Sequence, residues 1–404
     1  MLRTRTDDRS IDYTATEDVA AAIARIGRTE DVRFSPDGSR LLLVGHFTDR
    51  LLILHLKMGG PGPDRVMLTA FTEVESPSLG RPHGAVWIDA ETLIVANRAA
   101  ALSMIRIPEA RGATVTVDAV RIMGANGEDL IKTPGSIEIN AIGDGLIEMF
   151  VCNNYVDHVS RHLIDTRNGY QLIASDVLVD DVSVPDGIAL SPSGRWIAIS
   201  NHESRDVLIV RDDRRQGSPA RPAGALTGTR YPHGLTFTPD ERHVLVADAG
   251  APQVLLYSSD DGDWSGERKP SQVIRTMSDA LFRRGHRFPS EGGPKGMDLS
   301  RDSRIMVTTC QEQPLAFFDM EGLIESCGPV ETPRDAVRDI LVSYLVSSRA
   351  EKLREGQAMQ RVFEFDRKLL AEQQQRVNRL LASSSWRITA PLRWFGERVK
   401  GRKG

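Results

Sequence analysis

One pattern of hydrophobic and polar residues recurs through most of the chain. A short loop opens an apolar strand, a turn rich in Asp, Ser, Pro or Gly follows, and a second apolar strand comes after the turn. The six copies read TEDVRFSPDGSRLLLVGH, PHGAVWIDAETLIVAN, PGSIEINAIGDGLIEMFVCN, PDGIALSPSGRWIAISN, PHGLTFTPDERHVLVAD and PKGMDLSRDSRIMVTT. A third apolar run follows each copy, and several copies have a fourth. The pattern therefore predicts six sheets of similar construction.

The copies recur at nearly constant intervals. The second residue of the opening loop falls at Glu30, His83, Gly135, Asp186, His233 and Lys295, so the intervals range from 47 to 62 residues. Such spacing of three- or four-stranded units is typical of a β-propeller. We predict an all-β, six-bladed β-propeller over residues 19–325, with a C-terminal α-helical extension. The longest interval, before Lys295, indicates an inserted surface loop.

Closure of the ring needs an outer strand that the sixth copy lacks. Residues 19–27, VAAAIARIG, precede the first copy and have the apolar character of such a strand. We expect them to complete blade six and to leave the ring without an open edge. Residues 1–18 would then form an N-terminal arm.

Composition excludes several classes of protein. The 404 residues are 40% hydrophobic and 26% charged, which is ordinary for a globular protein. A net charge of -4 gives no basic field, so we expect no nucleic-acid partner. The three cysteines are far apart and form no disulfide framework or structural zinc motif. Neither a signal peptide nor an apolar run of transmembrane length is recognisable, so we expect a cytoplasmic protein.

Equivalent positions of a propeller lie on a ring around its axis. Glu30 would therefore face Asp186, and His83 would face His233, with Lys295 opposite a gap at Gly135. Carboxylate and imidazole ligands suit a divalent metal ion, whose identity the pattern leaves open. We predict Glu30, Asp186 and His233 as its ligands. Such an ion would lower the pKa of a bound water or polarise a carbonyl.

The ends of the second strands form another polar column. Its members are His46, Asn97, Asn153, Asn201, Asp248 and Thr309. We expect both columns to line one polar funnel, in which a ligand contacts His46, His83, Asn97, Asn153, Asn201, Asp248 and Lys295. The alternative is structural, because Asp, Asn and His at strand ends also hydrogen-bond turns and neighbouring blades.

The repeated unit resembles NHL-like propellers and the gluconolactonase (regucalcin)-like group over residues 19–319. The resemblance implies a six-bladed fold, which hosts enzymes and pure binding modules alike. In the gluconolactonase group it also implies an axial divalent cation, held by a Glu of the first blade and by Asn or Asp of later blades. Glu30 and Asp186 match that pattern, and Gly135 and His233 depart from it. Amidating-lyase propellers instead hold a metal with histidines of different blades, as His83 and His233 would.

The C-terminal region has a different character. Residues 326–384 contain few turn residues and have apolar positions at helical spacing, so we predict helices with a coiled-coil segment. Residues 385–404 form a basic amphipathic tail with six Lys or Arg residues against Glu397 alone. The string SWRITAPLR in this tail resembles a short element of bacterial glycosyltransferases and companion proteins of cell-surface polysaccharide synthesis. The resemblance implies a partner of that kind. The basic amphipathic composition of the tail instead suits an anionic membrane surface, on which the protein would be peripheral to the inner membrane.

Three functions remain open at this point. The first is a propeller of surface-polysaccharide biosynthesis, which binds a cation or a sugar-derived ligand in its funnel and is tethered by its C-terminal region. The second is a non-catalytic scaffold for protein contacts. The third is a metal-dependent hydrolase or lyase of the lactonase type, so the pattern does not decide whether the protein is an enzyme.

The tail leads to a first testable prediction. Each cation near an anionic surface contributes ~1 kcal/mol, so the intact chain should co-sediment with anionic vesicles at low salt. Added salt should weaken the binding by screening, and removal of residues 385–404 should abolish it. If the full-length protein does not co-sediment with such vesicles at low salt, the result would instead favour a partner protein as the target of the tail.

Overall fold

The computed structural model describes residues 3–4, 9–59, 65–125, 130–212, 219–286 and 290–324. The predicted helical segment at 326–384 and the tail at 385–404 lie outside these residues. Within the described ranges, no helix has both the length and the apolar character needed to cross a membrane.

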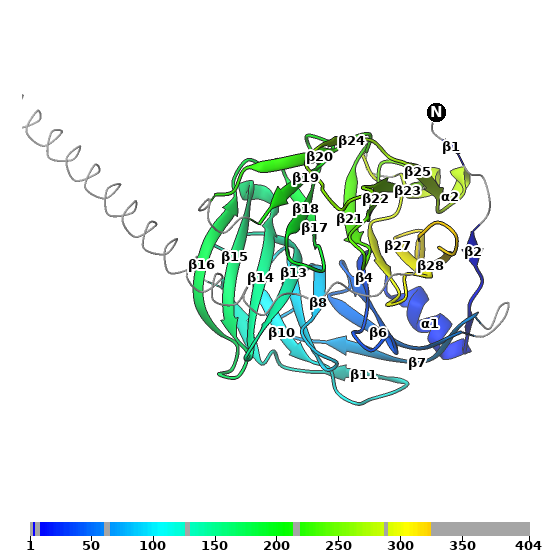
Figure 1. Ribbon diagram of the computed structural model, residues 1–404. Helices are drawn as coiled ribbons and strands as arrows, with labels where there is room; N and C mark the ends of the chain where they lie inside the picture. Colours follow the sequence, from blue (N-terminus) through cyan, green and yellow to red (C-terminus); the bar gives the residue numbers. More distant parts are fainter. Residues whose placement is uncertain are drawn as a thin grey trace, which may run out of the picture. The chain divides into compact units, whose positions relative to one another are not determined.

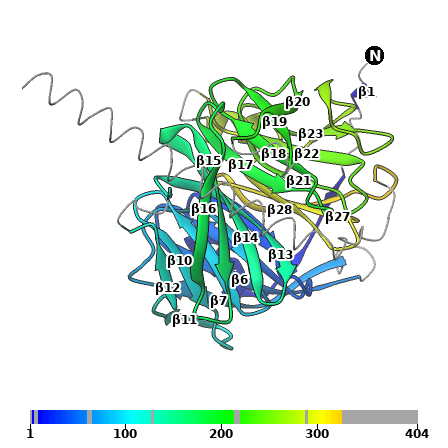
Figure 2. The ribbon, with the colours of Figure 1, turned by 60° about the vertical axis from the view of Figure 1, so that its left-hand side comes forward.

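In the described residues, the strands form six sheets around one axis, which confirms the predicted six-bladed β-propeller (Figures 1 and 2). Blade one holds β4 (Thr29–Phe34), β5 (Arg40–Gly45), β6 (Arg50–Met58) and β7 (Val66–Glu75), and blade two holds β8 (Pro82–Trp87), β9 (Thr92–Asn97), β10 (Leu102–Arg106) and β12 (Arg121–Met123). Blade three holds β13 (Pro134–Gly143), β14 (Leu146–Asn153), β15 (His158–Asp165) and β16 (Gln171–Val179), and blade four holds β17 (Pro185–Leu190), β18 (Trp196–Asn201), β19 (Asp206–Arg211) and β20 (Pro222–Leu226). Blade five holds β21 (Pro232–Phe237), β22 (His243–Asp248), β23 (Gln253–Ser258) and β25 (Gln272–Arg275), and blade six holds β26 (Gly296–Leu299), β27 (Ile305–Cys310), β28 (Gln313–Asp319) and β2 (Ser10–Ile11).

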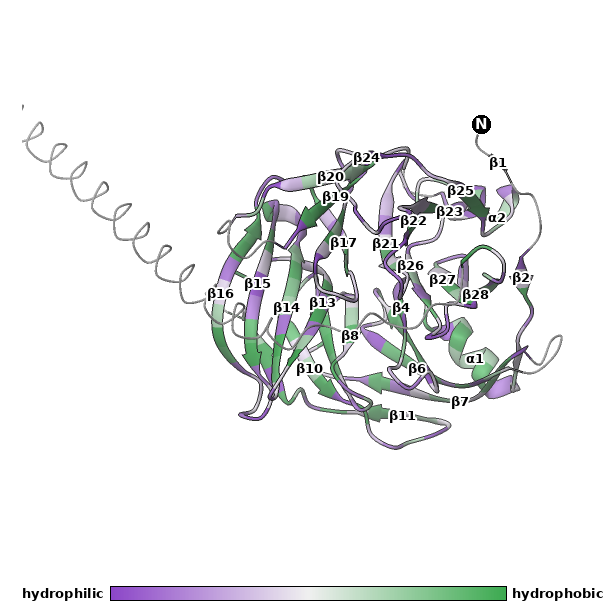
Figure 3. Ribbon diagram, in the orientation of Figure 1, coloured by the Kyte–Doolittle hydropathy of each residue, from purple (hydrophilic) through white to green (hydrophobic). Residues whose placement is uncertain are grey.

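The hydrophobic core lies between the blades. Each large cluster of buried side chains joins two neighbouring sheets; one of them packs Leu42 and Val44 of blade one against Leu93 and Val95 of blade two. Because a blade is covered on both faces, its middle strands are apolar at successive positions rather than at alternate ones. β9 is an example, with all six residues buried. Figure 3 shows hydrophobic residues along the strands, interrupted by hydrophilic ones.

The prediction for residues 19–27 was wrong. They belong largely to a helix, α1 (Glu17–Arg25), whose buried residues include Val19, Ala22 and Ile23. These positions, with the buried Ile26, have the i, i+3, i+4, i+7 spacing of a helix face. Glu17 and Asp18 in the first turn complement the helix dipole, and Gly27 takes a positive φ of 73° after the last turn. The apolar content suggested a strand, but the spacing and the three consecutive alanines favour a helix.

The N-terminal arm closes the ring instead. Ser10 and Ile11 of β2 pair antiparallel with Phe318 and Phe317 of β28. Arg9 strengthens the junction, because its Nη1 donates to the carbonyl oxygen of Asp319 at 2.9 Å. The arm therefore supplies the fourth strand of blade six, eight residues before the segment that we had predicted.

Other short strands cover the edges of further blades. β1 (Arg3–Thr4) pairs parallel with β25, β3 (Thr14–Ala15) and β11 (Ala113–Thr116) pair parallel with β7, and β24 (Gly266–Arg268) pairs parallel with β20. The outer edges of blades one, four and five are thereby paired with segments of other blades or of the arm. Such pairing protects edges that would otherwise be open to aggregation.

The arm gives a second prediction. Deletion of residues 1–12 removes β2 and Arg9, so the melting temperature should fall by roughly 5 °C or more, or the protein should aggregate. Deletion of residues 1–8 keeps β2 and Arg9 and should have a much smaller effect. Differential scanning calorimetry of both truncations tests the assignment, which fails if the longer truncation melts with the full-length chain.

Candidate functional site

The inner strands of the six blades bring their first residues together at the axis. Neighbouring inner strands contact one another around the whole ring, from β4 through β26 and back to β4. A glycine follows the ring residue in several blades, because the next strand leaves no room for a side chain. A Cβ on Gly187 would lie 2.0 Å from the carbonyl oxygen of His233, and one on Gly296 would lie 2.6 Å from Cα of Asp31. The PxG motif is thus a packing requirement of the axis.

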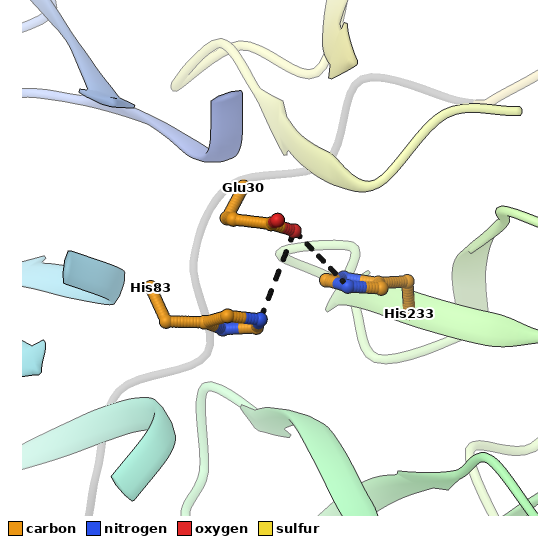
Figure 4. A group of neighbouring side chains, drawn as sticks. All are labelled: Glu30, His83 and His233. Carbon is orange, nitrogen blue, oxygen red and sulfur yellow. Dashed lines mark ion pairs between the residues drawn. The ribbon is translucent and has the colours of Figure 1, made fainter. Parts of the chain in front are cut away.

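Two carboxylates and two imidazoles converge in this ring. His233 Nε2 lies 3.0 Å from Oδ2 of Asp186 and 3.5 Å from Oε2 of Glu30. His83 Nε2 lies 3.7 Å from an oxygen of each of these carboxylates. The rings of His83 and His233 stack with their centroids 5.4 Å apart. Figure 4 shows both imidazoles pointing at the carboxylate of Glu30. The structure therefore places these four predicted residues within reach of one another.

Glu30 is the carboxylate of one side of the ring. Its side chain is fully buried, and Lys295 Nζ contacts both oxygens, at 3.2 Å for Oε1 and 2.9 Å for Oε2. Nε of Arg28 donates to Oε1 as well. Burial raises the pKa of Glu30, but Lys295, the two histidines and Arg28 outweigh it, so the pKa lies well below its ordinary value. Glu30 is therefore ionised and held by two cations.

Asp186 is the carboxylate of the other side. Its Oδ1 accepts from Arg98 Nη2 at 2.8 Å and from Asn154 Nδ2 at 2.6 Å. Burial raises the pKa of Asp186, whereas the surrounding histidines, His233 first, lower it well below its ordinary value. Asn154 begins a 3-10 turn, η2 (Asn154–Val156), directly after β14. Its amide fills the gap predicted at Gly135, where a Cβ would lie 1.9 Å from Oδ1 of Asn154.

Burial lowers the pKa values of three histidines at the ring, His233, His83 and His46. Burial lowers the pKa of His233 to about 4, and Asp186 offsets this only in part. Burial also lowers the pKa of His83 well below its ordinary value, and Arg98 adds to the effect. His46 lies against His83, with the ring centroids 5.8 Å apart, and burial lowers its pKa too. Neutral imidazoles are able to bind a metal ion or accept a proton.

Two groups of ring side chains have the composition of a metal site. Glu30, His83 and His233 form one, and Asp186, His202 and His233 form the other. In the first group, Oε2 of Glu30 already contacts the ammonium of Lys295. In the second, the buried Oδ2 of Asp186 contacts Nε2 of His202 at 3.4 Å and Nε2 of His233 at 3.0 Å, and the described residues give it and His202 Nε2 no further hydrogen-bond partner. The second group therefore fits a cation better than the first.

Four members of the second predicted column serve the blades themselves. The side chains of Asn97, Asn153, Asn201 and Asp248 accept from backbone N–H groups of the loop that opens their own blade: Gly80, Lys132, Ser183, and the pair Arg230 and Tyr231. Thr309 Oγ1 donates to the carbonyl oxygen of Pro314 at 2.6 Å. These residues therefore hydrogen-bond the turns of their own blades, which was the alternative to lining a funnel. The structure does not place their hydrogen-bonding groups in the ring.

A neighbouring column carries the side chains that reach the ring. The residues that follow the first four column positions are Phe47, Arg98, Asn154 and His202. Arg98 and Asn154 bind Asp186, and His202 Nε2 lies 3.4 Å from its Oδ2. Successive strand residues point to opposite sides, so an offset of one residue changes the whole surroundings of a side chain. Reading both positions of each strand end would have found this column.

The rim of the ring combines cations with exposed aromatic rings. The guanidinium of Arg98 lies 5.4 Å from the ring of Tyr155, and that of Arg28 lies 5.4 Å from the ring of Phe47. Tyr155 is 64% exposed and Phe47 60% exposed. Tyr231 stacks on His202 with a centroid distance of 4.0 Å. The mouth therefore offers flat apolar faces beside positive charge.

Deeper on the inner strands, a second charged layer supports the ring. Arg33 Nε lies 3.2 Å from Oδ2 of Asp31, and its Nη1 lies 3.5 Å from Oε2 of Glu138. Asp298 accepts from the backbone N–H of Phe34 at 2.8 Å. Burial raises the pKa of Asp298 to about 6, against the attraction of Arg33. The layer ties the inner strands of three blades together below the ring.

One family model describes a propeller over part of the chain. This model, described as the lipoprotein LpqB β-propeller domain, matches residues 2–125. No curated protein matches the chain. Similar solved structures include a functionally unknown protein from Desulfotomaculum acetoxidans, at 13% identity and a TM-score of 0.48, covering 75% of this chain and 88% of that one. A luciferin-regenerating enzyme has 10% identity and a TM-score of 0.49, covering 77% and 97%. The periplasmic gluconolactonase of Pseudomonas aeruginosa has 15% identity and a TM-score of 0.48, covering 72% and 80%.

Proposed function

We propose that this protein binds a small anionic, sugar-derived ligand at the mouth of the axial ring. One observation carries the proposal: Arg28 and Arg98 lie beside the exposed rings of Phe47 and Tyr155, and Lys295 contacts the carboxylate of Glu30 that Arg28 also contacts. Guanidinium groups pair with carboxylate or phosphate through two parallel hydrogen bonds. Exposed aromatic faces give the apolar side of a flat ligand a surface on which to pack.

The buried carboxylates fix the orientation of these cations, and the cations remain able to bind an anionic ligand. Arg98 uses Nη2 for Asp186 and Nη1 for the hydroxyl of Tyr155, so its guanidinium plane is fixed between the ring and the rim. A guanidinium held in this way loses little conformational freedom when an anion binds. The rim therefore supports recognition of an anionic group rather than of a neutral sugar alone.

A metal-dependent hydrolase or lyase is the second candidate function. The buried Oδ2 of Asp186 and Nε2 of His202, which lie 3.4 Å apart, favour it together with Nε2 of His233. This set replaces the predicted ligand Glu30 by His202, because Glu30 is held by Lys295 and Arg28. A divalent ion at this set would polarise a carbonyl or lower the pKa of a water. Asp186, His202 and His233 would hold that ion in the ring.

The cellular setting is a further part of the proposal. It rests on the SWRITAPLR string and the basic tail, both outside the described residues. A cytoplasmic propeller of bacterial surface-polysaccharide synthesis, bound to a glycosyltransferase or peripherally to the inner membrane, accommodates a sugar-derived anion as ligand. A non-catalytic scaffold would use the same tail but would need no polar ring.

The ligand is tested by titration calorimetry with glucuronate, glucose 1-phosphate and neutral glucose. We expect both anions to bind, glucose to bind at least tenfold more weakly, and Arg98→Met to weaken the anions by about tenfold or more. Arg121→Met removes the same charge from exposed β12 and should have no effect. If none of the three compounds binds, the scaffold function is favoured; equal binding of glucose and the two anions would refute anion recognition.

The metal is tested by elemental analysis after dialysis against Zn²⁺ or Mn²⁺. We expect about one ion per chain, which His202→Gln and Asp186→Asn should lose. His83→Gln, a histidine of the other group only, should keep it. Loss of the ion in the His83 variant and retention in the His202 variant would assign the metal to Glu30, His83 and His233 instead.

A further inference from the structure

Besides Glu30 and Asp186, a third carboxylate, that of Glu291, contacts cations of the ring. It comes from the segment that precedes blade six. Oε2 of Glu291 lies 2.7 Å from Lys295 Nζ and 3.0 Å from Arg28 Nη2. A single oxygen therefore bridges the two cations that also hold Glu30. Burial raises the pKa of Glu291, but Lys295 and Arg28 outweigh it and lower the pKa below its ordinary value.

The four groups form an alternating square of charge. The side chain of Glu30 is fully buried on the inner side, and those of Lys295 and Arg28 are 5% and 13% exposed. The Glu291 side chain is the most exposed of the four, at 19%. Of the four groups, Glu291 is thus the one most accessible to an anion from solvent.

The backbone around Glu291 is anchored, whereas its carboxylate stands at the end of a flexible stem. His286, which follows α2 (Asp279–Gly285), lies with Nδ1 2.7 Å from the carbonyl oxygen of Glu291. The N–H of Gly293 donates to the carbonyl oxygen of Ala249 at 2.8 Å. A Cβ on Gly293 would lie 2.0 Å from the carbonyl oxygen of Ala251, so the loop is packed onto blade five. Rotation of the side chain alone is enough to vacate the cations.

The geometry points to Arg28 and Lys295 as the subsite for the anionic group of the ligand, with Glu291 as its internal occupant until the ligand displaces it. This inference rests on the proposed function, and it assigns the ligand's carboxylate or phosphate to one position. Exchange of the Glu291 carboxylate for the ligand's anionic group leaves both cations paired. In the free protein, Glu291 thereby keeps the two cations paired. A ligand must compete with this carboxylate for Arg28 and Lys295, so neutral molecules do not displace it.

Glu291→Gln tests the inference, because it removes the charge and keeps the shape. The variant should bind glucuronate and glucose 1-phosphate about tenfold more tightly than the wild-type protein, since the ligand no longer competes with a carboxylate. Glu312→Gln is the matched control: Glu312 pairs with Arg284 of α2 at 3.2 Å, and its loss should leave the affinity unchanged. Glu291→Ala should show the same gain, and Arg28→Met added to Glu291→Gln should cancel it.

The outcomes separate the two proposals. Wild-type protein that binds the anions, with no gain in either Glu291 variant beyond the Glu312 control, overturns the subsite and leaves the proposed function standing. Binding by the Glu291 variants alone supports both. If neither the wild-type protein nor the folded variants bind an anion, both are overturned.

Discussion

The close approach of six inner strands at one axis is the constraint on which the rest of the structure depends. Gly187 and Gly296 show how little space remains, because any side chain there would overlap the next strand. The ring side chains consequently have nowhere to go except toward one another. At Gly135 the missing side chain is replaced by the amide of Asn154, which arrives from a different strand end. The axis is thus filled by polar side chains from the strand ends.

This crowding explains the protonation states of the ring. Among the described residues of the ring and its rim, Arg28, Arg98 and Lys295 face Glu30, Asp186 and Glu291 through direct ion pairs. A charged His83 or His233 would add an unbalanced cation to a buried space, and burial accordingly lowers the pKa of both imidazoles. Buried ion pairs contribute little net stability, and loss of one partner costs about 3–5 kcal/mol. An apolar axis would serve folding equally well, and this favours a binding role for the charged one.

The blades and the ring could be predicted from the sequence, because a repeat reports equivalent positions directly. Glu30, His83, Asp186 and His233 were found in this way.

Two inferences went wrong for physical reasons. The segment at 19–27 was judged by its apolar content, although Val19, Ala22 and Ile23 lie at helical spacing. The column at Asn97 and Asn201 was expected in the funnel, but these amides hold their own opening loops, and the next residues, Arg98 and His202, reach Asp186. Arg28 and Glu291 lie in loops that precede ring residues. The six copies share no pattern there, so the alignment of the copies could not predict these two side chains.

The departures from the repeat give the ring its polarity. Six identical blades would make every position of the axis equivalent, and an asymmetric ligand would then have no preferred orientation. Here the Glu30 side is saturated by Lys295 and Arg28, and the longest interval between repeats adds Glu291 to it. On the Asp186 side, Oδ2 of Asp186 contacts Nε2 of His202 and Nε2 of His233. One side thus offers cations behind an exchangeable carboxylate, and the other offers donor atoms for a cation. A ligand with an anionic group at one end and a metal-coordinating group at the other would bind in a single orientation, which is the property that a specific site on a symmetric scaffold requires.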